Sequence, residues 1–362
     1  MTITSTLGRY FSLRFFNTIM SVFLAIIGMV YVFDFVEMLR RTNGMPGITA
    51  GFVAVLSLLR TPSVAEQILP FCVLFGTMTA FLDLSRKFEL IVARAAGVSV
   101  WQFLVPPIGI ALLIGTLSVA LFNPLSAEMK QRADSIEAKL FGRSGQPEGD
   151  TTLWIRQKSV DGEAILRAAR SLNSGTLLTS VTAYVYEPDG RFEARVHADR
   201  ATLLPGVWEL QNAEIIAPGE EARHVGTYLL ATDLSPDRLA ENFLTPDSVP
   251  FWSLQRLRRE SEQAGLDSTG FRLQYQTLLA RPLLLVAMVL IAAAFSLRFF
   301  RLGGIAQTIG GGIAAGFLLY LATKMVADFG NSGLLSTPVA AWSPAVVGTL
   351  LGALALLHQE DG

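Results

Sequence analysis

Two adjacent arginines follow the first long apolar stretch of the chain, where a membrane helix would end. Arg40 and Arg41 are preceded by the acidic residues Asp34 and Glu37 on the same predicted helix. A guanidinium group makes paired contacts to a phosphate, so the two arginines could bind a phosphate-bearing headgroup. Alternatively, they extend to ordinary phospholipid headgroups, or they form an ion pair with Glu37, three residues before Arg40.

A second pair of charged residues, Lys324 and Asp328, lies four positions apart near the end of the fifth apolar stretch. An ionisable side chain inside a membrane span is a candidate functional group. The spacing also predicts a structural ion pair, because residues four apart on a helix are neighbours on one face. Both hypotheses remain open from the sequence.

The polar segment 83–99, between the second and third apolar stretches, could dock a partner protein. Its middle consists of helix-forming residues, and Gly97 is a suitable C-terminal stop. The segment includes the charged residues Arg86, Glu89 and Arg94. A short helix at about 85–97, lying on the membrane surface, could dock into a partner. The alternative is an amphipathic helix that only connects two spans.

Six largely uncharged stretches predict six membrane-spanning helices. The chain has 362 residues, 16% of them charged, and a mean hydropathy of +0.44. A helix needs about 20 apolar residues to cross a bilayer. The two shortest stretches become long enough if each begins a turn or two earlier, with Glu66 or Arg281 near a membrane interface. The stretches are Phe15–Phe33, Gln67–Leu82, Ala95–Ala127, Pro282–Leu297, Leu302–Thr323 and Phe329–Leu357.

The distribution of basic residues predicts that both chain ends are cytoplasmic. Short cytoplasmic segments are enriched in Lys and Arg, and the basic residues of the short loops favour a cytoplasmic N-terminus, with the Arg40–Arg41 pair as the exception. The first apolar stretch exceeds the h-region of a signal peptide, about 7–15 residues, so we expect it to be retained. Six spans then place the polar middle on the opposite side from both ends.

The polar middle predicts an all-β domain. From Thr151 to about Thr232, apolar and polar residues alternate, and turn signals such as the one at 187–191 recur. Short strands at regular spacing predict a sandwich or roll. Residues Asn123–Arg143 continue the third helix beyond the membrane, and Phe251–Gly265 predict an amphipathic helix that leads back. The predicted domains are 1–124 with three spans, 125–270 with the β domain, and 271–362 with three further spans.

No motif for catalysis, metal binding or nucleotide binding stands out. Cys72 is the single cysteine, and the three histidines are far apart, so no zinc site is predicted. The glycines at 310–312 lack the preceding strand and the Lys-Ser/Thr of a P-loop, so any ATP would be bound by another chain. They fit close helix packing instead. A net charge of −1 gives no general attraction to nucleic acid.

The run from Glu89-Leu90 to Ala93–Ser99 resembles the hallmark loop of the LptF/LptG permease family. The similarity covers essentially the whole chain in order, and the segment 34–41 is more similar to the LptG type than to the LptF type. Ser343-Pro344 departs from the Pro-Asn pair expected there. Further matches are Arg9-Tyr10, Asp34–Glu37 with Arg40-Arg41, Tyr184–Gly190, Pro282 and Ala341-Trp342.

This resemblance implies one permease half of a lipopolysaccharide exporter in the bacterial inner membrane, with a periplasmic β-jellyroll-like domain. The expected partners are a sister permease, a cytoplasmic ATPase dimer that binds the ATP, a single-span jellyroll protein and a periplasmic bridge. The chain itself is expected to hold no cofactor and to catalyse no reaction.

The resemblance also implies roles for individual residues. The family's coupling helix matches Arg86–Gly97, and Glu89 matches the acidic residue that faces the ATPase. Arg40 and Arg41 become candidates for binding the phosphates of lipid A, with Asp34 and Glu37 orienting them. Arg132, just beyond the third span, is a further candidate for lipid binding.

Three other hypotheses are kept beside the LptG-type permease. The chain could be the sister LptF-type subunit, which has the same fold. It could be a membrane lipid-modifying enzyme, for which the sequence offers only Asp34, Glu37, Lys324 and Asp328. Macrolide or lipoprotein exporters also have an extracytoplasmic domain, but it follows their first span, whereas here it follows the third.

Overall fold

The computed structural model describes residues 5–44, 47–97, 99–141, 153–159, 162–172, 176–187, 189–233, 245–263, 267–298 and 305–360. The chain forms two compact units. The first comprises Met1–Gln131, Val249–Gln255 and Thr269–Gly362, and the second comprises Arg132–Ser248 and Arg256–Ser268. The division after Gln131 lies within the helix that continues the third span.

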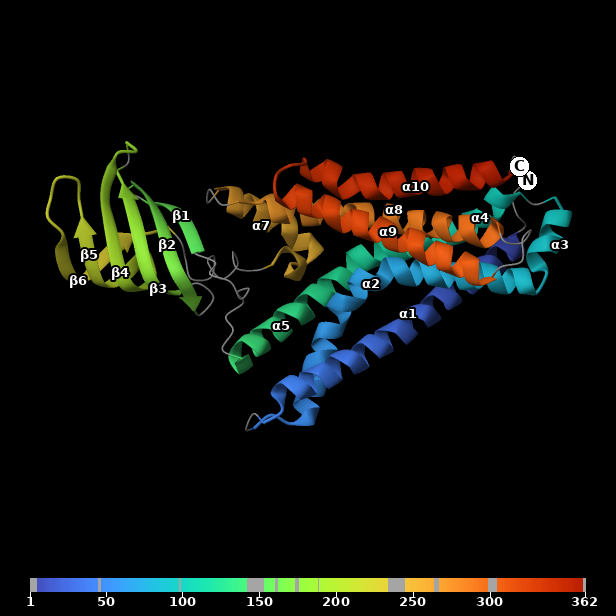
Figure 1. The fold of residues 1–362 in the computed structure, drawn as a ribbon, viewed down its shortest axis with the longest axis horizontal. Coiled ribbons are helices and arrows are strands. Elements are labelled where there is room, and N and C mark those ends of the chain that lie inside the picture. Colours follow the sequence, from blue (N-terminus) through green and yellow to red (C-terminus); the bar gives the residue numbers. More distant parts are fainter. Residues whose placement is uncertain are drawn as a thin grey trace. The chain divides into compact units, whose positions relative to one another are not determined.

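Among the described residues, six helices are long and apolar enough to cross a membrane, which confirms the six predicted spans (Figure 1). The third span continues from α4 through the π-helix η1 (Ser118–Phe122) into α5 (Asn123–Phe141). Glu66 and Arg281 lie well inside their helices, not in the first turns. The other bounds are α1 Ser5–Thr42, α2 Ala50–Arg86, α4 Val100–Leu117, α8 Thr269–Arg298, α9 Ile305–Asn331 and α10 Thr337–Glu360.

Helix α8 is central to the first unit, where it packs against α2, α4, α9 and α10. Two glycines allow neighbouring helices to approach closely. A Cβ on Gly76 of α2 would lie 2.5 Å from the Cα of Ile19 on α1, and a Cβ on Gly115 of α4 would lie 2.6 Å from the Cα of Pro282 on α8. Small residues at helix contacts are the usual means of such packing in membranes.

The second unit contains one antiparallel sheet of six strands in the order β1-β2-β3-β4-β5-β6. The predicted all-β domain is therefore present as a single sheet. The side chain of Gln157 on β1 accepts hydrogen bonds from Trp208 on β5 (3.0 Å) and from Thr232 after β6 (2.6 Å), so the sheet curls on itself. The strands are β1 Leu153–Ser159, β2 Gly162–Leu172, β3 Leu177–Tyr186, β4 Phe192–Leu204, β5 Val207–Ile216 and β6 Arg223–Ala231.

A transverse crease allows both halves of the sheet to face one core. In the described strands, a break in the residue pairing runs across the sheet through Ser180 of β3, Asp199 of β4 and Asn212 of β5. Ser180 and Asn212 have φ values of 49° and 54°, and the Asn212 amide donates to Asp199 at 3.1 Å. Buried residues are spaced by three across the crease and by two elsewhere, so the apolar face is preserved.

The turns and the connecting helix largely follow the sequence signals. Gly190 has a φ of 85°, as the predicted turn requires, whereas Pro188 lies outside the described residues. The N–H and guanidinium of Arg191 hold the pKa of Asp189 in this turn below its usual range. Helix α7 (Phe251–Gln263) begins where predicted, and its proposed stop at Gly265 lies outside the described residues.

Candidate functional site

The loop predicted to dock a partner contains a seven-residue helix, α3 (Glu89–Ala95), after a tight turn. Helix α2 ends at Arg86, and Phe88 then has a φ of 60°, a left-handed conformation that interrupts the helix. Gly97 follows α3 with a φ of 82°, consistent with its predicted role as a stop. The helix is therefore shorter than the predicted 85–97, and Arg86 belongs to α2.

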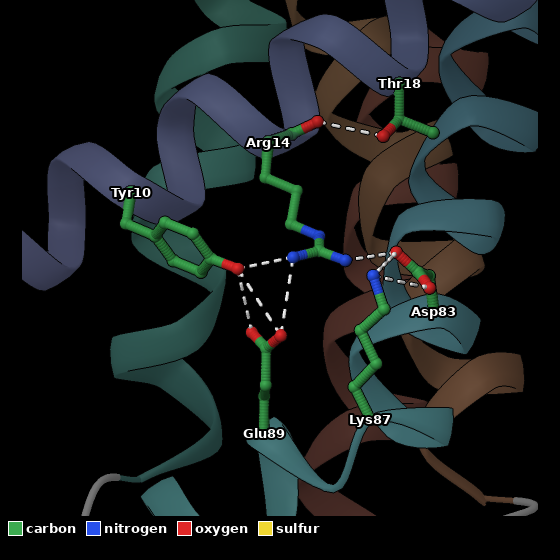
Figure 2. A network of polar contacts seen from close by, with 6 residues as sticks. All are labelled: Tyr10, Arg14, Thr18, Asp83, Lys87 and Glu89. Atoms are coloured by element: carbon green, nitrogen blue, oxygen red, sulfur yellow. Dashed lines mark hydrogen bonds and ion pairs between the residues drawn. The ribbon is translucent and has the colours of Figure 1, made fainter.

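A polar network ties the start of α3 to the first two spans (Figure 2). The Glu89 carboxylate accepts hydrogen bonds from the Tyr10 hydroxyl at 3.1 Å and from the Arg14 guanidinium at 3.4 Å. Arg14 also donates to the Tyr10 hydroxyl and forms an ion pair with Asp83 on α2. Lys87 lies 3.4 Å from the Asp83 carboxylate. One network therefore joins α1, the last turn of α2 and the first residue of α3.

The network is partly shielded from water. The side chains of Arg14 and Glu89 are 18% and 31% exposed. An ion pair in such a setting is screened less than one at the surface. Glu89, which was predicted to face a partner, thus has partners within its own chain, and a displacement of α3 would act directly on α1. Arg94 lies in α3, but its side chain is outside the described part of the structure.

The outward side of the turn and of α3 is apolar. Leu90 is buried, whereas Phe88, Ile91 and Val92 are 64%, 38% and 67% exposed. Arg86, at the end of α2, is also exposed. Exposed apolar groups clustered beyond the end of a span mark a surface that can bind another protein. We call Phe88, Ile91 and Val92 the α3 apolar patch.

At the opposite end of α1, Glu37 holds both arginines of the predicted lipid site. Its carboxylate accepts from Arg40 at 3.0 Å and from Arg41 at 2.8 Å. Asp34 does not join them, contrary to the prediction, because it faces α2 and lies 3.6 Å from the Arg60 guanidinium. The Arg40 and Arg41 side chains are 78% and 53% exposed, so both remain accessible to a ligand.

The predicted ion pair between Lys324 and Asp328 is not formed in the described structure. The Lys324 ammonium lies 5.8 Å from the centre of the Tyr320 ring, one turn earlier on α9, in a cation–π contact. Arg132 is exposed on α5. Within the first unit, Lys324 makes no described contact with Glu37, Arg40 or Arg41. No group of three or more His, Cys, Asp or Glu among the described residues is placed to hold a metal ion.

The sequence reasoning missed a buried polar cluster inside the spans. The Arg281 guanidinium of α8 forms an ion pair with Glu66 of α2, and the Asn123 amide donates to the same carboxylate at 2.9 Å. The hydropathy pattern predicts Glu66 and Arg281 near a membrane interface. The signal was present, since each is a charge within a long apolar helix, but their separation by 215 positions gave no hint of the pairing.

Comparisons with known proteins agree with this architecture. Residues 9–358 match the family model of the lipopolysaccharide export system permease LptF/LptG. The chain is 22% identical to the lipopolysaccharide export system permease protein LptG of Escherichia coli (strain K12) over 321 residues, which cover 87% of this chain and 88% of the relative. The LptG protein of Escherichia coli O6:H1 (strain CFT073) gives the same values. The chain therefore belongs to the LptF/LptG family of lipopolysaccharide export permeases.

Proposed function

We propose that this chain is the LptG-type permease subunit of an ATP-driven exporter that extracts lipopolysaccharide from the inner membrane and passes it to a periplasmic jellyroll bridge. The observation that carries the proposal is the family match across nearly the whole chain, on a layout of three spans, a β domain and three spans. The N- and C-termini would be cytoplasmic and the β domain periplasmic, as the basic residues of the loops indicate.

Energy would enter at the α3 apolar patch. A separate ATPase dimer would bind the patch and its basic neighbour Arg86, because the chain offers exposed apolar groups there and has no P-loop. Closure of the ATPase dimer would push α3, and the network through Glu89 would pass that displacement to α1 and α2. The chain would carry no cofactor of its own.

Lipid would be held near the Arg40–Arg41 pair. Both guanidinium groups are exposed, and each can contact a phosphate of lipid A through two N–H groups. Glu37 orients them and offsets part of their charge. Arg132 and Lys324 are further candidates for lipid contacts at other points of the path.

A sister permease would cover the two least enclosed spans. In the most apolar part of each helix, 6% of the residues of α1 and 11% of the residues of α9 are buried, whereas 67% are buried in α8. The exposed side chains of α1 and α9 would form the lateral surface against the sister subunit and the lipid between the two. The edge strands β1 and β6 would be available to the single-span jellyroll protein by strand addition.

The runner-up is the LptF-type subunit, which shares the fold and the family. The similarity of segment 34–41 to the LptG type favours the first assignment. The decisive comparison is which sister permease restores activity when the two are combined.

Reconstitution tests the proposal. The chain would be co-purified with a sister permease and its ATPase dimer, and placed in liposomes containing lipopolysaccharide. We expect ATP-dependent transfer of lipopolysaccharide to a soluble jellyroll acceptor when the sister is of the LptF type. Transfer only with an LptG-type sister would reverse the assignment, and lipid modification by the purified chain without an ATPase would replace the transporter with an enzyme.

A further inference from the structure

The buried cluster inside the spans joins three helices through one carboxylate. Arg281 and Asn123 both donate to Oε1 of Glu66, from α8 and from the start of α5. We call these three residues the Glu66 clamp. The side chains of Glu66 and Arg281 are 8% and 13% exposed, and Asn123 is 1% exposed. Well-packed apolar residues often replace a buried ion pair without loss of stability, so stability alone does not account for it.

The clamp also holds the first residue of α7. Oδ1 of Asn123 accepts a hydrogen bond from the backbone N–H of Phe251 at 2.9 Å, and the pair is separated by 128 positions. The first N–H groups of a helix have no partner within that helix. Asn123 therefore caps α7 with one end of its amide while the other end binds Glu66.

Two further contacts attach the same end of α7 to the spans. The Trp252 indole N–H donates to the carbonyl of Ala120 in η1 at 3.2 Å. In an α-helix, that carbonyl would accept from residue 124, but Pro124 has no N–H. The Phe251 ring stacks on Tyr275 of α8, with ring centres 5.2 Å apart and planes inclined by 7°. The start of α7 is thus fixed to both the third and the fourth span.

Both helices that begin at this point extend beyond the membrane unit. Helix α5 passes from the first unit to the second after Gln131, and α7 does so after Gln255. Asn123 is the first residue of α5 and Phe251 is the first of α7, so the hydrogen bond between them joins the starts of the two helices. A movement of α2 or α8 that shifts Glu66 or Arg281 would reach both helices at once.

We propose that Glu66, Asn123 and Arg281 are positioning residues for the passage of lipid from the spans to the β domain. The clamp sets the starts of α5 and α7, and thereby transmits span movement to the two helices that lead into the β domain. The identity of the transported molecule as lipid rests on the proposed function. The coupling of the three helices through the Glu66 clamp rests only on the contacts described above.

Two variants separate positioning from stability in the assembled complex. Asn123→Leu cuts α7 from the clamp and leaves the ion pair in place. The double variant Glu66→Leu/Arg281→Met replaces the ion pair with apolar groups and removes the acceptor of the buried Asn123 amide, so thermal stability should fall by no more than the loss of one buried hydrogen bond. We expect both variants to hydrolyse ATP within about twofold of the wild-type rate. The rate at which lipopolysaccharide reaches the β domain should fall by about tenfold, which is the factor that corresponds to the loss of one buried hydrogen bond.

Hydrogen exchange provides a readout that does not depend on lipid. Amides in a peptide covering 249–254 should exchange faster in Asn123→Leu than in the wild type, since the Phe251 N–H loses its acceptor. Trp342→Phe is the matched control, because it removes one hydrogen bond of 3.0 Å between α10 and Gln276 of α8 without touching the clamp. We expect unchanged lipid delivery and unchanged exchange at 249–254 in this control.

Wild-type delivery by the stable double variant would overturn the inference and leave the proposed function intact. Equal loss of delivery in Trp342→Phe would also overturn it, because any lost polar contact would then suffice. A wild-type complex that hydrolyses ATP and delivers no lipid would refute the proposed function instead. In that case the hydrogen-exchange measurement still tests whether Asn123 holds the start of α7. Unchanged protection of residues 249–254 in Asn123→Leu would show that it does not.

Discussion

The hydroxyl of Tyr10 lies 3.1 Å from the carboxylate of Glu89, although 79 positions separate the two residues. The contact brings the first turns of α1 to the first residue of α3, and Arg14 extends it to Asp83 on α2 (Figure 2). The short loop between the second and third spans is therefore attached to the first span through side chains. A displacement of α3 would act on α1 through this attachment, in addition to the packing of the buried Leu90.

Glu89→Ala should uncouple ATP hydrolysis from transport. The substitution removes the acceptor of both Tyr10 and Arg14, so α3 can move without α1. We expect transport to fall by about tenfold or more, while the partly exposed pair contributes only about 0–1 kcal/mol to stability. Transport and ATPase rates in proteoliposomes measure this, with Tyr10→Phe as the milder control. Full transport by Glu89→Ala would show that the network has no part in coupling.

Phe88→Gly should leave the chain stable and weaken its binding to the ATPase. The φ of 60° at Phe88 is strained for a bulky residue and free of strain for glycine, so stability should stay within about 1 kcal/mol or rise. The exposed ring is the largest group of the α3 apolar patch, and loss of an aromatic anchor at an interface costs about 2 kcal/mol or more. Affinity for the isolated ATPase dimer measures the effect. Unchanged affinity would place the docking surface elsewhere.

Gly76→Ala should destabilise the contact between α1 and α2. Its Cβ would lie 2.5 Å from the Cα of Ile19, so one helix must shift, at a cost of about 1–3 kcal/mol. Gly28→Ala on α1 is the matched control, because it meets no atom within 4 Å and should be neutral or stabilising by up to about 1 kcal/mol. Thermal unfolding can be followed by a thiol-reactive dye, since the single cysteine, Cys72, is buried. Equal melting temperatures would contradict the close approach.

Gln157→Leu should open the curled sheet. Its side chain accepts from Trp208 and Thr232, and loss of the acceptor for the buried Trp208 indole N–H costs about 1–3 kcal/mol. Hydrogen exchange of β1, β5 and β6 in the whole chain should accelerate together. Thr182→Val removes an exposed contact to His197 on the same sheet and should change nothing measurable. If hydrogen exchange accelerated only in β1, Gln157 would not be holding β1 to β5 and β6.

Glu37→Gln should strengthen binding of phosphate-bearing lipid. The carboxylate neutralises part of the charge of Arg40 and Arg41, so its removal should raise affinity by about twofold to fivefold, with a steeper dependence on salt. Native mass spectrometry of the lipid-bound protein measures the occupancy. Asp34→Asn is the control, because Asp34 pairs with Arg60 and should leave occupancy unchanged. Lower occupancy in Glu37→Gln would mean that orientation of the arginines matters more than their charge.

The sequence alone was sufficient for the layout of the chain. Apolar stretches of membrane-spanning length predicted six spans, and alternation of period two predicted a β domain between the third and the fourth, because both signals are local. Local signals also located the glycine stop after α3 and the start of α7 at Phe251. The family resemblance added the importance of Glu89.

Which charged residues pair with one another depends on how the helices pack. Glu89 pairs with Arg14, Asp34 with Arg60 and Glu66 with Arg281, and these partners are 75, 26 and 215 positions apart in the sequence. A hydropathy pattern predicts which residues are buried. Which charged side chains form ion pairs depends on where the helices cross and on how closely glycines allow the helices to approach. The sequence therefore determined the elements and their order along the chain. The packing of α2 and α8 brought Glu66 and Arg281 together, because a buried charge is tolerated only where its partner lies within reach.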